Sequence, residues 1–221
     1  MSEGKRKMSG NTKSVFQEDK FFTWRGKEVS RIENLSDIVF ALALTLIVAS
    51  SVPSSFNDIS AMWREGIAIA ICFVVLLAIW YEHYLFFRRY DLEDRRTILL
   101  NSMLIFLVMV FAYPLKFLVT FLVNLFTGYF TSNQEIASVL SLEQAPWLTV
   151  IYSFGYAAVF FVYGLLYAHA LKHADRIGLS EAERILTHTS IKSKAVHVVF
   201  GMLVALLALT LPENWNLLAG G

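Results

Sequence analysis

Three polar side chains lie inside stretches of the sequence that are otherwise apolar: Asp37, His83 and Asn101. A carboxylate beside an imidazole can relay protons, and carboxylate and amide oxygens can contact a cation. A less specialised alternative is a polar clamp, in which the three groups satisfy one another and hold neighbouring segments together. The residue types alone leave all three roles open.

The stretches around these residues are typical of helices that cross a lipid bilayer. The chain of 221 residues is 56% hydrophobic and 17% charged, with a mean hydropathy of +0.54, which is too apolar for an ordinary soluble domain. Five segments approach the ~20 residues needed to cross the bilayer core. We expect an all-α, polytopic membrane protein with five to six transmembrane helices, in one domain from residue 31 to 221. The five predicted helices span about 34–52, 64–88, 97–126, 146–171 and 193–212.

The distribution of basic residues predicts how these helices are oriented. Eight basic residues precede the first helix or open it, and the following loops contain one, four, none and five. Cytoplasmic loops carry an excess of lysine and arginine, so we expect a cytoplasmic N-terminus in a multi-pass protein of the cell (plasma or inner) membrane. Residues 1–30 then form a basic cytoplasmic tail and an interfacial segment. The net charge of +1 argues against nucleic acid as a partner.

Depth in the membrane relates the polar residues to one another. The nearest flanking arginine lies six residues from Asp37, five from His83 and five from Asn101. At 1.5 Å per residue, all three lie roughly 7–9 Å inside the cytoplasmic boundary. An isolated charge at membrane depth costs about 2.5–3.5 kcal/mol, so we expect Asp37 to accept hydrogen bonds from His83, Asn101 or Arg31. The predicted polar layer consists of Arg31, Ser36, Asp37, Trp80, His83 and Asn101.

A separate face of the first predicted helix is smooth and apolar apart from one hydroxyl. Leu42, Thr45, Leu46 and Ala49 follow one another at i, i+3, i+4 and i+7, and Asp37 lies about 140° around the helix from Leu42. Such a stripe is either a helix-packing surface or the lining of a transport pathway. Periodicity does not separate the two.

The first three predicted helices resemble a known family. The stretch "RIENLSD" at 31–37, continued by "VFALALTL" at 39–46, is similar to the R-x-x-x-F-S-D signature of the transmembrane-protein-175 potassium channels of lysosomes and bacteria. The stretch "WYEHYLFF" at 80–87 resembles the W-x-x-H-x-x-x-F pattern of the second helix of that family. The stretch "LNSMLIFLVMVFAYP" at 100–114 resembles its third helix. The resemblance covers residues 31 to about 115.

The resemblance implies a homotetrameric channel for potassium ions in a lipid bilayer, with K⁺ as the permeant ion and no cofactor. The family's hydrophobic constriction falls on Leu42, the threonine one turn outward on Thr45, and further pore lining on Leu46 and Ala49. Its anchoring network falls on the residues of the polar layer. The bacterial type has six helices, so the resemblance also implies either a sixth helix beyond this chain or further membrane structure in residues 116–130.

Several other functions receive less support from the sequence. No T-V-G-Y-G loop is present, so the classical pore-loop architecture is not expected. His169 and His173 share a helix face but have no evident third ligand, so we expect no metal site. No paired nucleophile and base converge, so we expect no enzyme and no catalytic residues. The main alternative is a proton-coupled secondary transporter that uses Asp37 and His83, although the inverted repeat expected of many such transporters is not visible.

Overall fold

The described part of the chain folds into helices only. A computed structural model describes residues 21–49, 56–128, 139–141 and 144–210, without the side chains of Ala49, residues 56–64 and Tyr113. No strand occurs within these ranges. The helices are α1 (Arg31–Ala49), α2 (Phe56–Tyr90), α3 (Arg95–Phe126), α5 (Ala145–Lys172) and α6 (Glu181–Thr210).

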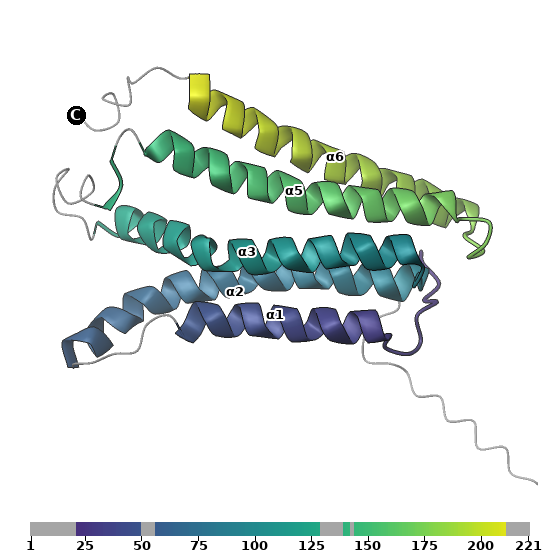
Figure 1. Ribbon diagram of the computed structural model, residues 1–221, viewed down its shortest axis with the longest axis horizontal. Coiled ribbons are helices and arrows are strands. Elements are labelled where there is room, and N and C mark those ends of the chain that lie inside the picture. The colour runs from purple at the N-terminus through teal and green to yellow at the C-terminus, as the bar shows by residue number, and fades with distance from the viewer. Residues whose placement is uncertain (1–20, 50–55, 129–138, 142–143, 211–221) are drawn as a thin grey trace, which may run out of the picture.

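The helices run roughly alongside one another in an elongated bundle (Figure 1). Helices α1, α2 and α3 pack together, and α5 and α6 form a long hairpin that contacts α3 and, through side chains, also α2. Helices α1 and α6 lie on opposite sides of the bundle. The start of α1, the α2–α3 loop and the α5–α6 loop gather at one end, which we call the loop end (Figure 1).

Four of the helices are long and apolar enough to cross a membrane. These spans are Glu65–Tyr90, Arg95–Ala112, Ala145–Lys172 and Glu181–Thr210. Helix α1 is not among them within the described residues, and it carries three charged residues in its first seven positions. Over the described residues, the all-helical structure and its four apolar spans confirm the predicted all-α, polytopic membrane fold class.

Two helices begin earlier than predicted because their first turns are polar and are stabilised by capping residues. Helix α1 begins at Arg31 instead of 34, and α6 begins at Glu181 instead of 193. At both starts, a serine and a glutamate three residues later bond to each other's backbone amides, which is a capping box. The predicted helix ends at 50–52 and 211–212 lie outside the described residues.

Helix α3 continues through Pro114. Proline has no amide hydrogen to donate, so one intrahelical bond is lost there, but the helix runs from Arg95 to Phe126. The hydroxyl of Tyr152 on α5 donates to the Pro114 carbonyl. Residues 116–126, where extra membrane structure was one alternative, therefore continue the third helix.

Candidate functional site

Helix α1 is fixed at its start by a buried ion pair. The Glu33 carboxylate accepts the Ser30 amide at 2.8 Å, and its other oxygen lies 3.4 Å from Nη2 of Arg88, at the end of α2. Both side chains are at least nine-tenths buried. This pair sets the position of the first turn of α1 relative to α2, and thereby the position of Ser36 and Asp37 one turn later.

Three of the predicted polar-layer residues form a continuous hydrogen-bonded chain across α1, α3 and α2. The Asn101 amide nitrogen donates to Oγ of Ser36 at 2.8 Å, and the Asn101 amide oxygen lies 2.9 Å from Nε2 of His83. Because the amide oxygen can only accept, Nε2 of His83 is the donor. All three side chains are almost completely buried, so each partner satisfies a group that has no access to solvent.

Asp37 does not make the hydrogen bonds that the sequence analysis predicts for it. Its carboxylate accepts the indole Nε1–H of Trp80 at 2.7 Å, and no bond joins it to His83, Asn101 or Arg31. The reason is the rotation of α1: Ser36 faces into the bundle toward Asn101, whereas Asp37 is exposed at the side. His83 is already bonded to Asn101, so Trp80, one turn earlier on α2, reaches the carboxylate instead.

Arg31 is the polar-layer residue that the structure does not bring to the others. It occupies the first position of α1 and is exposed. Within the described residues, no hydrogen bond or ion pair connects it to Asp37. The arginine that pairs with a residue of α1 is Arg88, which contacts Glu33.

The two faces of α1 have different environments. Phe40, Ala43 and Ile47 are buried against α2 and α3. Leu42 is 45% exposed and Leu46 is 39% exposed, so the predicted apolar stripe is not used for packing within the chain. The Thr45 hydroxyl donates to the Ala41 carbonyl at 2.8 Å and is also exposed. Ala49 ends the helix, and its side chain lies outside the described part of the structure.

Sequence reasoning missed a partly buried arginine that connects the N-terminal segment to the hairpin. Arg25 makes a bidentate contact with Glu183 of α6, at 3.0 and 2.9 Å, and donates to carbonyls of the α5–α6 loop. The next residue, Gly26, lies so close to α2 that an added Cβ would be 2.7 Å from the Phe87 carbonyl oxygen. Residues 22–30 form this connection and are called the N-terminal clasp below.

Two further side-chain pairs connect the hairpin to α2 and to the residue that caps α3, and they were not predicted either. Nζ of Lys194 on α6 lies 2.9 Å from Glu82 of α2, among the rings of α5. Nε2 of His169 lies 2.7 Å from Asp94, which caps α3. Burial tends to raise the pKa of Asp94, but the hydrogen bonds from His169 and the Thr97 and Arg96 amides outweigh it and lower that pKa to about 2.

These contacts have one local signal in the sequence, which is the pair of serine–glutamate capping boxes at Ser30 and Ser180. Glu33 and Glu183 each belong to one of these boxes, and each binds an arginine. No group of three metal-ligating side chains occurs among the described residues, and His169 packs its ring on His173.

Comparison with known proteins identifies relatives of this chain. The family model described as endosomal/lysosomal potassium channel TMEM175 matches residues 31–114, which hold α1, α2 and the first part of α3. A potassium channel of Marivirga tractuosa is 40% identical over 199 residues, covering 88% of this chain and 80% of that protein. One from Chamaesiphon minutus is 26% identical over 166 residues, covering 71% and 72%.

A solved structure has the same fold over almost the whole chain. It is the crystal structure of a threonine-to-alanine variant of the potassium channel MtTMEM175 in complex with a nanobody–maltose-binding-protein fusion. The two chains superpose with a TM-score of 0.81 at 36% identity, covering 91% of this chain and 90% of that one. Together with the Marivirga relative, this match shows that the chain is a multi-pass membrane protein that belongs to the TMEM175 family, in its bacterial form.

Proposed function

We propose that this protein is a potassium-conducting channel whose pore is lined by α1. The observation that carries the proposal is the exposed stripe of Leu42, Thr45 and Leu46, on a helix whose other face is buried. A packing surface would be covered within the chain, and this stripe is not. Relatives in the same family carry the name potassium channel, which supports K⁺ as the permeant ion.

The pore requires several copies of the chain. One α1 helix cannot enclose a pathway, and homo-oligomers of membrane and soluble proteins generally close by rotational symmetry. We propose a homotetramer with four α1 helices around the axis and the α5–α6 hairpins at the periphery. In support, α6 lies on the side of the bundle opposite to α1 (Figure 1).

Leu42 and Leu46 would then form hydrophobic rings one turn apart, with Ala49 beyond them. Narrow apolar constrictions gate by dewetting, because a ring of leucines offers an ion no oxygen to replace its hydration shell. The Thr45 hydroxyl is the one polar group on the stripe, so selectivity for K⁺ is assigned to Thr45 together with the width of the constriction.

The polar layer holds α1 in place while the stripe faces the ions. Ser36, His83 and Asn101 connect α1 to α2 and α3 from the buried side, and Asp37 connects it to α2 at the side. The transporter alternative requires Asp37 and His83 to exchange protons. Their side chains bond to different partners, Trp80 and Asn101, which disfavours that alternative.

The basic residues that gather at the loop end support our proposal that this end faces the cytoplasm and that the protein lies in a cell membrane. A potassium flux assay in liposomes tests the function. A channel dissipates a K⁺ gradient in a manner that follows the membrane potential, at a rate that does not depend on an opposing pH gradient. Strict coupling of K⁺ movement to an opposite proton gradient would show a transporter instead.

A further inference from the structure

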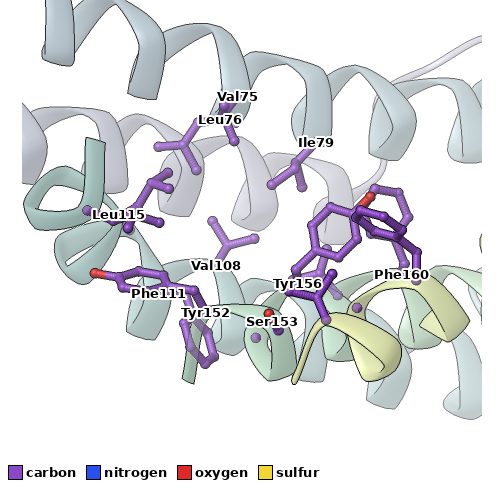
Figure 2. A pocket seen from close by; sticks show the side chains of 17 residues that line it. Val75, Leu76, Ile79, Val108, Phe111, Leu115, Tyr152, Ser153, Tyr156 and Phe160 are labelled. Atoms are coloured by element: carbon purple, nitrogen blue, oxygen red, sulfur yellow. The ribbon is translucent and has the colours of Figure 1, made fainter. Parts of the chain in front are cut away.

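An apolar cavity of about 370 Å³ lies between the α2–α3 pair and the α5–α6 hairpin. Figure 2 shows side chains from both groups pointing into the same space, among them Leu76, Val108 and Phe160. The volume falls within the ~300–1,000 Å³ range of small-molecule sites. The cavity is remote from the stripe of α1, and neither the polar layer nor the proposed pore uses it.

The cavity opens sideways, at a surface that belongs to membrane-spanning helices. Two residues at its wall, Tyr156 of α5 and Phe200 of α6, are 40% and 60% exposed and lie within the spans. The hydroxyl of Tyr152 is already used by the Pro114 carbonyl. An apolar cavity does not hold ordered water, because water needs polar partners. At this depth the surrounding medium is lipid acyl chain.

Polar side chains of α6 come just before the residues that line the cavity, on the side of the loop end. On α6, His197, Phe200, Gly201 and Val204 follow one another at helical spacing, and the last three line the cavity. The His197 ring stacks on Phe160 at 4.3 Å, and Lys194 lies one turn closer to the loop end. Lys194 is buried and paired with Glu82, so it offers no free charge to a ligand.

One wall of the cavity is set by a close helix contact. An added Cβ at Gly201 would lie 2.9 Å from the Ser153 carbonyl oxygen, so α5 and α6 approach closely there, and both residues line the cavity. The site thus combines a preformed shape, an apolar lining and a lateral opening.

We propose that this cavity binds one acyl chain of a bilayer phospholipid, whose head group lies at the membrane surface on the side of the loop end. The occupant is an elongated apolar chain because the lining is almost entirely apolar and the opening lies at the surface of membrane-spanning helices. It enters sideways from the bilayer. The proposal does not depend on ion conduction.

A photoreactive lipid tests the site directly. The full-length protein is reconstituted in vesicles of phosphatidylethanolamine and phosphatidylglycerol that contain phosphatidylglycerol with a diazirine halfway along one acyl chain. After illumination, the labelled peptides are identified by mass spectrometry. We expect label concentrated on residues 152–160 and 200–204, in excess of equally exposed positions such as Phe161.

Matched substitutions show whether the cavity itself is responsible. Val75→Phe fills the cavity, whereas Val74→Phe places the same ring on the lipid-facing side of α2, where Val74 is 65% exposed. Val75→Phe should reduce labelling of both peptides several-fold, and Val74→Phe should leave it unchanged. Val204→Trp, compared with Leu203→Trp, repeats the test on α6 and serves if Val75→Phe does not fold.

Label spread evenly over the exposed faces, with both members of each pair behaving alike, would overturn the proposal. A disulfide between two copies through Phe200→Cys, formed in a background with Cys72→Ser, would also overturn it. That result would show that a second chain, rather than lipid, covers the opening.

Discussion

At the scale of single residues, Asn101 contributes most to the polar layer, because it binds groups on two other helices at once. Its amide donates to Ser36 of α1 and accepts from His83 of α2, and all three side chains are buried. Asp37 makes one bond, to Trp80, and is itself exposed. An unpaired buried group costs more than an unpaired exposed one, since water can replace the lost partner only at the surface.

We therefore predict that Asn101→Ala destabilises the protein more than Asp37→Ala does, by about 1–3 kcal/mol for each buried group left without a partner. Leu42→Ala, on the exposed stripe, should change the stability of the chain least. Thermal unfolding in detergent, followed by circular dichroism, gives the order. Equal melting of Asn101→Ala and the parent would show that the layer does not hold the helices together.

Thr45 gives a prediction about selectivity. Its hydroxyl is the only polar group on the exposed stripe, and valine has nearly the same shape without the hydroxyl. Thr45→Val should lower the preference for potassium over sodium while K⁺ flux continues. Reversal potentials under bi-ionic conditions measure the ratio. Thr189→Val, on α6, is the matched control, because the Thr189 hydroxyl also donates only to its own helix and is exposed.

At the scale of elements, polar contacts decide how the α5–α6 hairpin sits on α2 and α3. Lys194 and Glu82 form the ion pair between α6 and α2, and Tyr167 of α5 donates to the same carboxylate at 3.1 Å. Lysine is almost completely buried here, whereas the glutamate side chain is about one-third exposed. Removing one partner therefore leaves a charge that is only partly hydrated.

We predict that Lys194→Met and Glu82→Gln each destabilise the protein, with an effect below the ~3–5 kcal/mol expected for a completely buried pair. The double variant should be more stable than the sum of the single effects predicts, because neither charge is then unpaired. Thermal unfolding of the four proteins provides the double-mutant cycle. Strictly additive effects would show that the two groups do not stabilise each other.

The sequence predicts the helices better than their contacts. Hydropathy identifies the spans, since ~20 apolar residues are needed wherever a helix crosses a bilayer. The distances in sequence from the flanking arginines also predict that His83 and Asn101 lie at one depth in the membrane. Neither signal predicts that Asp37 binds Trp80, because the rotation of α1 is set by packing of Phe40, Ala43 and Ile47.

Long-range ion pairs have almost no signal in a single sequence. Arg25 and Glu183 are 158 residues apart, and each is surrounded by residues of ordinary polar type. The capping box identifies Glu183 as a helix-start residue, but nothing local indicates which arginine it binds. The N-terminal clasp was accordingly expected only as an interfacial segment.

At the scale of the whole molecule, the chain divides into a part that carries the proposed pore and a part that surrounds it. Helices α1 to α3 hold the exposed stripe, the polar layer and the match to the family model. The α5–α6 hairpin holds much of the wall of the apolar cavity and lies on the far side from α1 (Figure 1). A symmetric assembly with α1 at its axis places the hairpin against lipid.

This arrangement predicts which positions meet between subunits. In a background with Cys72→Ser, cysteine at Leu42 should form disulfides between chains under mild oxidation. Cysteine at Leu206, which is 57% exposed on α6, should not. Non-reducing electrophoresis of the reconstituted protein detects the products. Cross-linking at Leu206 alone would place α6 rather than α1 between subunits.

The most direct test of α1 as the pore helix is the K⁺ flux of Leu42→Asn in liposomes. Asparagine keeps a similar size but adds a carbonyl and an amide to the narrowest ring, so it should weaken dewetting and raise basal K⁺ flux. Leu206→Asn makes the same change on the exposed face of α6 and should leave flux at the parental rate. An unchanged flux in Leu42→Asn, together with a raised flux in Leu206→Asn, would contradict a pore lined by α1.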